Sequence, residues 1–207
     1  MVVIIDYDVS NIFSVENAFR TIGAPAVVSR NADDIRRADR LVLPGVGAFP
    51  DGMRNLARFG LVQPLRDAVI GEKKCILGIC LGMQLLASLG EEHTVVKGLG
   101  IVPGRVRRFR VNEQMFPVPH IGWNDVSPHN SALLQGIEHP IFYFVHSYHL
   151  VPDDPAAIAA ECAYGETFAA AVERDNIFGV QFHPEKSQKN GLKVLENFLN
   201  LPSPHHA

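Results

Sequence analysis

The chain has 207 residues, of which 47% are hydrophobic and 20% charged, an ordinary composition for a globular protein with one well-filled core. The formal net charge is -3 and the 19 Lys and Arg residues form no basic stripe, which argues against nucleic acids and anionic membranes as partners. We therefore expect one domain over residues 1–207, with a frayed tail over about 201–207, and a small-molecule ligand.

No apolar run reaches membrane-spanning length, and MVVIIDYDVSN lacks the basic start and cleavage site of a signal peptide, so we expect a cytoplasmic protein. Cys75, Cys80 and Cys162 are too few and too irregularly spaced for a disulfide framework or a tetrahedral zinc site. The sequence thus predicts no metal and no cofactor. Cys75 and Cys162 have the character of small buried hydrophobes.

Short β-branched runs alternate with helical patterns over the first 90 residues. Their order is VVII, SNIFSVENAFRTIG, AVVS, NADDIRRA, RLVLPGVGAF, LVQPLRDAVIGEKK, CILGI and LGMQLLASLG. Alternation of this kind predicts an α/β fold with an open, mostly parallel central sheet and crossover helices on both of its faces.

After Gly90 the pattern changes to consecutive strand-like segments, GRVRRFRV, IFYFVHSYHL, IAAECAYG, FAAAVERD and IFGVQFH. Gly, Pro, Asn or Asp separates them, so we expect antiparallel strands that extend the same sheet. The final segment, QKNGLKVLENFLN, has apolar residues at helical spacing and predicts a closing helix.

The stretch CILGICLGMQLL places Cys80 between two glycines, where a strand should end at Ile79 and a helix begin near Leu81. Gly78 and Gly82 remove side chains that would crowd such a turn, as in the nucleophile elbow G-x-S-x-G, here with sulfur in place of oxygen. A helix N-terminus stabilises a thiolate, and its free N–H groups can hold an oxyanion. The pattern predicts a thiol that attacks a carbonyl; the alternative is a small buried hydrophobe.

A cysteine nucleophile needs a base, and the base needs a group that orients it. In IFGVQFHPEKS, His183 follows an apolar run and Glu185 lies two residues further on. Sites in open α/β sheets form outside the carboxyl ends of the strands, so the ends of CILGI and IFGVQF can meet. Cys80, His183 and Glu185 are therefore the predicted triad.

Eight other histidines have simpler interpretations. Those in loops or in the tail should be solvated, and those in apolar or aromatic surroundings should be satisfied core residues. The first group is His93, His129, His139, His205 and His206, and the second is His120, His146 and His149.

The motifs GICLGMQ and HPE resemble the class I, triad-type glutamine amidotransferases. LPGVGAF, PHIGWN, YFVHSYH and GVQFHPEKS narrow the resemblance to the glutaminase subunits of imidazole glycerol phosphate synthase, in histidine biosynthesis. It covers nearly the whole chain, from DYDVSNIFSV to LKVLENFL. One departure is that Asp8 and Ser10 stand beside Asn11 where the family usually has glycines; Asp tolerates positive φ better than most residues, so the turn can be kept.

The resemblance implies that the Cys80 thiolate attacks the side-chain amide of L-glutamine, and that His183 protonates the departing ammonia before water hydrolyses the thioester. Glu185 would orient and charge the imidazole. It also implies an oxyanion hole of backbone N–H groups and a set of contacts to the amino acid part of glutamine. The oxyanion groups would be those of Leu81 and of the PGVG loop, Gly45, Val46 and Gly47, and the contacts those of Gln84, Ser147 and Tyr148.

These implied roles have plain alternatives. Taken alone, PGVG is equally an ordinary β-to-helix turn, Gln84 an ordinary helix residue and HSY an ordinary strand. If the PGVG loop rests with a carbonyl facing the site, the tetrahedral intermediate lacks a donor. The isolated chain would then be a poor glutaminase until a partner changes the loop.

The sequence contains no phosphate loop, dinucleotide fingerprint or metal cluster for a second substrate, so an acceptor enzyme should take the ammonia through a closed path. The resemblance implies that this partner is a (β/α)₈-barrel cyclase subunit in a heterodimer, which makes imidazole glycerol phosphate and aminoimidazole carboxamide ribotide. Interface candidates are Asn11, Trp123, Tyr143 and Lys186, with core packing an equal alternative for the two aromatics.

Three rival functions remain open at this point. A related amidotransferase could serve another acceptor, and a cysteine peptidase or γ-glutamyl hydrolase would need an open groove and no partner. A non-catalytic regulatory subunit is the third, and the intact Cys, His and Glu set argues against it.

Overall fold

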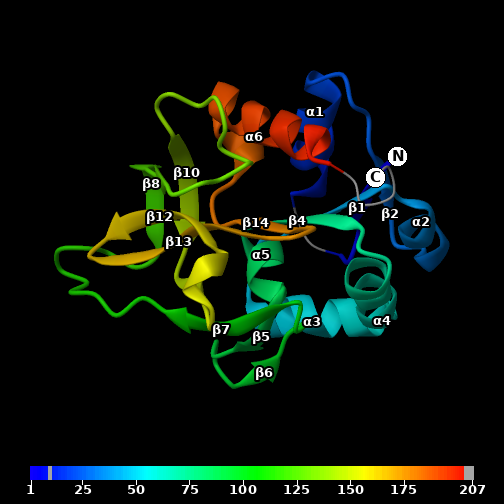
Figure 1. Cartoon of the computed structure of the whole chain (residues 1–207). Coiled ribbons are helices and arrows are strands. Elements are labelled where there is room, and N and C mark those ends of the chain that lie inside the picture. The colour runs from blue at the N-terminus through cyan, green and yellow to red at the C-terminus, as the bar shows by residue number, and fades with distance from the viewer. Residues whose placement is uncertain (9–10, 203–207) are drawn as a thin grey trace.

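The computed structural model describes residues 1–8 and 11–202 and is built around a central eight-stranded sheet (Figure 1). The strand order is β2-β1-β3-β4-β14-β13-β12-β9, parallel from β2 to β14 and antiparallel from there to β9. The strands are β1 (Val2–Ile5), β2 (Val27–Ser29), β3 (Arg40–Leu43), β4 (Cys75–Ile79), β9 (Ser127–Pro128), β12 (Ile158–Tyr164), β13 (Glu166–Arg174) and β14 (Ile177–Val180).

Helices cover both faces of this sheet, because its central strands are apolar on both sides. In β1, for example, Val3 and Ile5 enter one hydrophobic cluster and Ile4 enters the other. One face carries α1 (Ile12–Thr21) and α6 (Gln188–Asn200), and the other carries α2 (Ala32–Arg37), α3 (Phe49–Arg58), α4 (Val62–Arg66), which continues as a π-helical turn (Asp67–Gly71), and α5 (Leu81–Leu85) (Figure 1). The predicted fold class is confirmed.

Two smaller sheets correct the prediction that every later strand extends the central one. Only β13, β12 and β9 do so, while β14 joins the parallel strands beside β4. A four-stranded sheet has the order β11-β7-β5-β6, and β8 and β10 form a two-stranded ribbon. Their bounds are β5 (Ala87–Gly90), β6 (Val96–Lys97), β7 (Val102–Arg108), β8 (His120–Asp125), β10 (Ile141–His146) and β11 (Tyr148–Pro152).

Two segments differ from their predicted structure for the same physical reason. IFYFVHSYHL divides at Ser147 into β10 and β11, which belong to different sheets. LGMQLLASLG is helical only to Leu85, and its second half is strand β5, whose Leu89 and Gly90 pair with β7. In both cases pairing with strands distant in sequence overrides the local pattern.

None of the described helices is long and apolar enough to cross a membrane. Asp8 has φ 66°, as expected for a residue in a family turn that usually holds glycine, whereas Ser10 lies outside the described residues. Leu201 and Pro202 are the described part of the predicted tail.

Candidate active site

The candidate nucleophile lies at the carboxyl end of β4. The strand ends at Ile79 and α5 begins at Leu81, which leaves Cys80 alone on the turn with φ 52° and ψ -108°. Such a backbone conformation is strained for any residue with a Cβ. The Cys80 N–H donates to the Val180 carbonyl at 2.8 Å, so the neighbouring parallel strand β14 holds the turn in place.

The two flanking glycines allow a very close approach of α5 to the sheet. A Cβ at Gly82 would stand 1.7 Å from the Leu43 carbonyl oxygen, and a Cβ at Gly78 would stand 2.7 Å from the Met83 backbone nitrogen. Neither neighbour is the end of a flexible side chain, so neither can move aside. The predicted reason for both glycines is confirmed.

Cys80 is 5% exposed, and a buried amide contacts its sulfur. The Nε2 atom of Gln181 lies 3.7 Å from Cys80 Sγ, and the Val145 carbonyl oxygen lies 4.0 Å from it. Sequence reasoning missed Gln181. A signal was present, because residues two apart in an extended segment share one side, and Gln181 lies two residues before His183.

His183 and Glu185 form a buried pair. His183 Nδ1 lies 2.7 Å from Glu185 Oε1, and the Asn11 side-chain amide donates to the same oxygen at 2.6 Å. Both side chains of the pair are fully buried. Asn11, predicted as an interface residue, therefore contacts the carboxylate of the predicted triad.

The electrostatics of this pair favour its charged form. Burial lowers the pKa of His183, but the charges of Cys80 and Glu185 outweigh it and raise the pKa well above its usual value. Burial likewise raises the pKa of Glu185, yet the hydrogen bonds from His183 and Asn11 leave it below its ordinary value. His183 Nε2, the atom opposite the carboxylate, is buried and has no hydrogen-bond partner within the described residues. The Cys80 side chain also acts on this ring.

A pocket of about 250 Å³ opens beside Cys80. Gln84, Ser147 and Tyr148, the three predicted substrate contacts, all line it, and Gln84 Nε2 donates to the Tyr148 carbonyl at 2.8 Å. Glu92, which no sequence signal indicated, lines it as well, and one of its oxygens accepts from the Phe49 N–H at 2.7 Å. The other lining residues are Val46, Gly47, Cys80, Leu81, Pro119, Val145 and His146.

The PGVG loop rests with a carbonyl toward the turn. The Gly45 carbonyl oxygen accepts a hydrogen bond from the Leu81 N–H at 3.3 Å, so the N–H predicted to hold an oxyanion already has a partner. The start of the loop is tied down, since Tyr7 donates to the Pro44 carbonyl at 2.6 Å. Gly47, by contrast, is exposed, has φ 107°, and has open space where a Cβ would stand. The loop is hydrogen-bonded at Pro44 and Gly45 and exposed at Gly47.

Trp123, Tyr143 and Lys186 form one surface group, here called the ribbon cluster. The Trp123 and Tyr143 rings meet edge to face with centroids 6.0 Å apart, and the Lys186 ammonium lies 5.8 Å from the Tyr143 ring centre. Trp123 is 49% exposed, so the core-packing alternative is wrong for it, while Tyr143 is half-buried. The Tyr143 carbonyl accepts from the His183 N–H at 2.9 Å, which ties this cluster to the base of the predicted triad.

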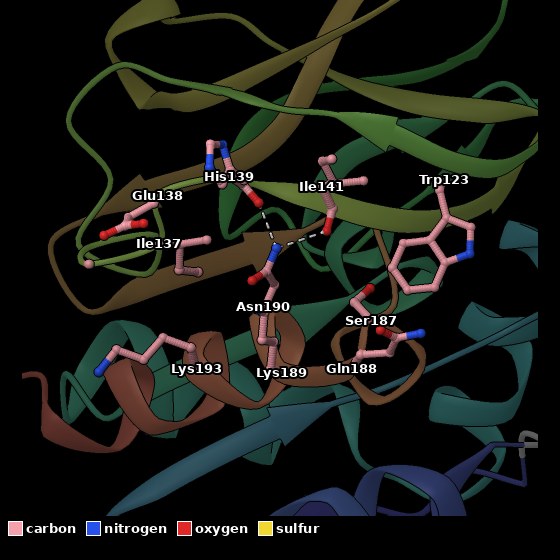
Figure 2. A pocket seen from close by; sticks show the side chains of 11 residues that line it. Trp123, Ile137, Glu138, His139, Ile141, Ser187, Gln188, Lys189, Asn190 and Lys193 are labelled. Atoms are coloured by element: carbon pink, nitrogen blue, oxygen red, sulfur yellow. Dashed lines mark hydrogen bonds between the residues drawn. The ribbon is translucent and has the colours of Figure 1, made fainter.

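A second hollow, of about 550 Å³, lies between the β8–β10 ribbon and the start of α6. Figure 2 shows Trp123 at one side of it and Asn190 at its centre, where the Asn190 amide donates to the His139 and Ile141 carbonyls at 2.7 and 3.3 Å. No member of the predicted triad lines this hollow. Of the predicted triad, Cys80 lines the smaller pocket instead.

Comparison with known proteins identifies relatives over the full chain. The family model for glutamine amidotransferase class-I matches residues 3–201. Imidazole glycerol phosphate synthase subunit HisH 2 of Pseudomonas aeruginosa is 48% identical over 203 residues, covering 97% of this chain and 100% of that protein. The subunit HisH of Salinibacter ruber is 46% identical over 213 residues, covering 100% of this chain and 97% of that protein.

Solved structures share the fold at lower identity. A crystal structure of a glutamine amidotransferase superposes with a TM-score of 0.75 at 17% identity, covering 96% of this chain and 97% of the other. PurLQS from Thermotoga maritima gives a TM-score of 0.71 at 20% identity, with coverages of 96% and 97%. The match of the family model over nearly all residues, with relatives close to half identical, shows that the chain belongs to the class I glutamine amidotransferase family.

Proposed function

We propose that this chain is the glutaminase subunit of imidazole glycerol phosphate synthase and acts in histidine biosynthesis. Relatives of that name, 48% and 46% identical over nearly the whole of both chains, support the assignment. The observation that supports it most directly is Cys80 on its strained turn, which lines a pocket and acts electrostatically on the buried His183–Glu185 pair. The proposal includes one functional domain over residues 1–207 and a cytoplasmic location.

Catalysis begins when the Cys80 thiolate attacks the side-chain carbonyl carbon of L-glutamine. A C–S bond forms and the carbonyl electron pair moves to oxygen. As the pair returns, the C–N bond breaks, and His183 Nε2–H gives its proton to the departing nitrogen, so that ammonia leaves and a thioester remains. Water then attacks the thioester, His183 takes the proton of that water, and glutamate leaves with the thiolate restored. Glu185, held by Asn11, keeps the imidazole oriented and stabilises its charged form.

The pocket lining supports glutamine as the substrate. Glu92 supplies a carboxylate for the α-ammonium group, and the β10–β11 connection at Ser147 and Tyr148 supplies backbone groups for the α-carboxylate. Gln84 contacts the same amino acid part from α5. We assign these four residues to substrate binding, while Cys80 faces the amide.

The resting state of the PGVG loop supports control of the reaction. With the Leu81 N–H bonded to the Gly45 carbonyl, that N–H is not free to hold the oxyanion. One such donor contributes roughly 3 to 4 kcal/mol, or about 10² to 10³ in rate. Rotation of a peptide in Gly45–Gly47 would remove the carbonyl and present an N–H beside that of Leu81. A partner can drive this rotation only through contacts that differ between the two loop states.

The partner in this proposal is a (β/α)₈-barrel cyclase subunit that forms a heterodimer with this chain and receives the ammonia. A closed path is needed because free ammonia is protonated by water and lost as a nucleophile. The ribbon cluster supports docking on the β8–β10 side, since it is exposed, aromatic and joined to His183 through the Tyr143 carbonyl.

The test is kcat for glutamine hydrolysis by this chain alone, with the cyclase, and with the cyclase and its nucleotide substrate. We expect low activity alone and a rise of about 10² to 10³ in the full system, the contribution of one oxyanion donor. Full activity of the isolated chain would contradict control by the loop. Stimulation by a different acceptor enzyme, with none by the cyclase, would instead favour an amidotransferase of another pathway.

A further inference from the structure

A chain of hydrogen bonds through two buried histidines runs behind the candidate glutamine pocket. The side-chain nitrogen of Asn124, in β8, lies 3.3 Å from His120 Nε2, and His120 Nδ1 lies 3.1 Å from His146 Nε2. His146 Nδ1 lies 2.8 Å from the carbonyl oxygen of Tyr148. The chain therefore begins one residue from Trp123 and ends on the backbone that lines the pocket.

Backbone carbonyls at both ends determine the direction of every bond in this chain. The Tyr148 carbonyl only accepts, so His146 carries its hydrogen on Nδ1 and its Nε2 accepts from His120. At the other end the Asn124 nitrogen also donates to the Ala163 carbonyl at 3.1 Å, which identifies that atom as the amide nitrogen and makes His120 Nε2 an acceptor. Both rings are neutral, with the hydrogen on Nδ1.

The surroundings of the two rings preserve this neutral state. His120 stacks on Tyr164 with centroids 4.0 Å apart, and His146 packs against Phe109 and Phe168 at 5.0 Å. Burial lowers the pKa of His120 to about 4 and that of His146 well below its ordinary value. The charged side chains beside the cluster, Arg107 and Glu166, pair with each other next to a third histidine, His149. On the pocket side, the groups near His146 are His183 and Cys80.

The Tyr148 carbonyl joins this chain to the groups that face the substrate. It accepts from His146 and also from Gln84 Nε2, at 2.8 Å each. Gln84 donates in turn to Gln181 Oε1 at 3.1 Å, and the Gln181 amide contacts the Cys80 sulfur. One polar network thus extends from Asn124 to the thiol, with the pocket along its side.

We propose that His120 and His146 are positioning residues for glutamine binding: as neutral Nδ1–H imidazoles they hold the Tyr148 carbonyl, and through it the Gln84 amide, in the orientation that receives the amino acid part of the substrate. The inference rests on the proposed function, because it takes the pocket to bind glutamine. Neither ring exchanges a proton with the substrate, since each is held between two partners. His120 and His146 therefore contribute to substrate affinity and have little influence on the rate of the chemical step.

The kinetic test uses the full chain in complex with the cyclase and its nucleotide. His120→Phe keeps the stacked ring and removes both hydrogen bonds, and His120→Asn keeps a donor close to the position of Nδ1. We expect KM for glutamine to rise about tenfold in His120→Phe with kcat within about threefold, and His120→Asn to recover most of the loss. His149→Phe is the matched control, because His149 is equally buried in the same aromatic cluster but lies outside the chain, and its KM should equal that of the wild type.

An unchanged KM in His120→Phe, or an equal rise in His149→Phe, would overturn the inference. A lower kcat at constant KM would also overturn it, because that result indicates a role in the chemical step. If the wild-type complex has no glutaminase activity, the proposed function fails and this inference fails with it. If the wild-type complex is active and His120→Phe has the same KM as the wild type, this inference fails and the proposed function stands.

A spectroscopic test is independent of turnover. In the full chain labelled with ¹⁵N-histidine, long-range nitrogen–proton correlation at neutral pH should show His120 and His146 as neutral Nδ1–H tautomers, the form that free histidine disfavours. The resonances are assigned by their loss in His120→Phe and in His146→Phe. Observation of Nε2–H tautomers or of imidazolium at either position would contradict the hydrogen-bond directions on which the inference depends.

Discussion

His183 is as deeply buried as two other histidines of this protein, His120 and His149, and yet it differs from them in charge. His183 has no exposed surface, and the pKa of its ring is raised. His120 and His149 are 2% and 1% exposed, and burial lowers the pKa of each to about 4. Burial alone therefore makes a histidine neutral, and a charged neighbour decides whether that outcome is reversed.

His149 shows that a nearby carboxylate is not sufficient to charge a buried histidine. Its Nε2 atom lies 3.5 Å from Glu166, but Glu166 is bound by both terminal nitrogens of Arg107, at 3.1 and 2.7 Å. Burial lowers the pKa of His149 and the Arg107 charge lowers it further, so Glu166 does not reverse the shift and the ring stays neutral. Glu185, by contrast, is bound only by the neutral amide of Asn11 and by His183 itself among the contacts described. His183 is charged because Cys80 and Glu185 both act on it and no cation competes for the carboxylate.

Removal of the thiol should have the largest effect, because it removes both the nucleophile and one charge that acts on His183. We expect Cys80→Ala to lower glutamine hydrolysis by at least about 10⁴, while synthesis from added ammonium salt by the complex survives. The measurements are glutaminase and ammonia-dependent synthase rates of the same preparation. Cys162→Ala, which removes another buried thiol, is the control and should leave both rates unchanged. Loss of ammonia-dependent synthesis in Cys80→Ala would contradict the proposed division of labour.

Glu185→Gln should move the pKa of His183 toward the low values of the neutral histidines. Without the carboxylate, only Cys80 opposes the effect of burial, so the pKa of His183 falls and kcat for glutamine hydrolysis drops by about 10² to 10⁴. A pH profile of kcat in the complex measures both effects. His129 and Glu161 form a pair with a similar 2.9 Å separation at the surface, so Glu161→Gln is the matched control. Equal losses in the two variants would show that the effect does not arise at the buried pair.

Lowering the pH should lower the free energy of unfolding, because the neutral histidines resist protonation in the folded state. The pKa of His120 and of His149 is about 4 in the folded protein against about 6.5 in the unfolded chain, so between these values the unfolded state binds more protons. The free energy of unfolding should then fall by about 2 kcal/mol per histidine from pH 7 to pH 5. His183 has a raised pKa, so its contribution is fully present below about pH 6.5 and is lost as pH rises through the folded value.

Urea denaturation of the wild type and of His149→Phe at both pH values separates these contributions. The variant should lose about 2 kcal/mol less than the wild type between pH 7 and pH 5. An identical acid loss in the two proteins would contradict the assignment of a low pKa to His149.

The smallest expected effect is a shift in the pKa of His149 after removal of the Arg107 charge. Arg107→Met leaves Glu166 to act on His149 alone, so the pKa of His149 should rise by about one unit or more. An NMR titration of His149 measures it. Arg105→Met is the control, because Arg105 lies on the same strand and pairs with Glu91 at a looser 3.8 Å. No shift in Arg107→Met would refute the explanation given above for the neutral state of His149.

Much of the parallel half of the central sheet, and much of the candidate site, can be predicted from local sequence signals. A β-branched run followed by an amphipathic segment is a local pattern, and so is a cysteine between glycines at a strand end. The meeting of β4 and β14, with Ile79 opposite Val180, follows from the rule that sites form at the carboxyl ends of parallel strands. The triad residues were therefore predictable as a group, whereas their catalytic roles stay a prediction.

The rest of the fold and of the candidate site depends on contacts between segments that are distant in sequence. Pairing of β10 with β8, and of β11 with β7, cannot be read from IFYFVHSYHL, because both strands have the same local character. Glu92 reaches the pocket through the turn after β5, which the sequence presents as a helix end. The state of the PGVG loop depends on a single hydrogen bond from Leu81 to Gly45. Such features are set by tertiary structure, where local propensity carries little information.

The close approach of α5 to the sheet has an evolutionary consequence. At Gly82 and Gly78 even a methyl group would meet fixed backbone atoms, at 1.7 and 2.7 Å. Selection at these two positions therefore acts on shape, whereas selection at Cys80 acts on chemistry. A lineage that lost glutaminase activity but kept the folded subunit would be free to replace the cysteine and still be unable to replace either glycine. The flanking glycines would outlast the nucleophile they surround.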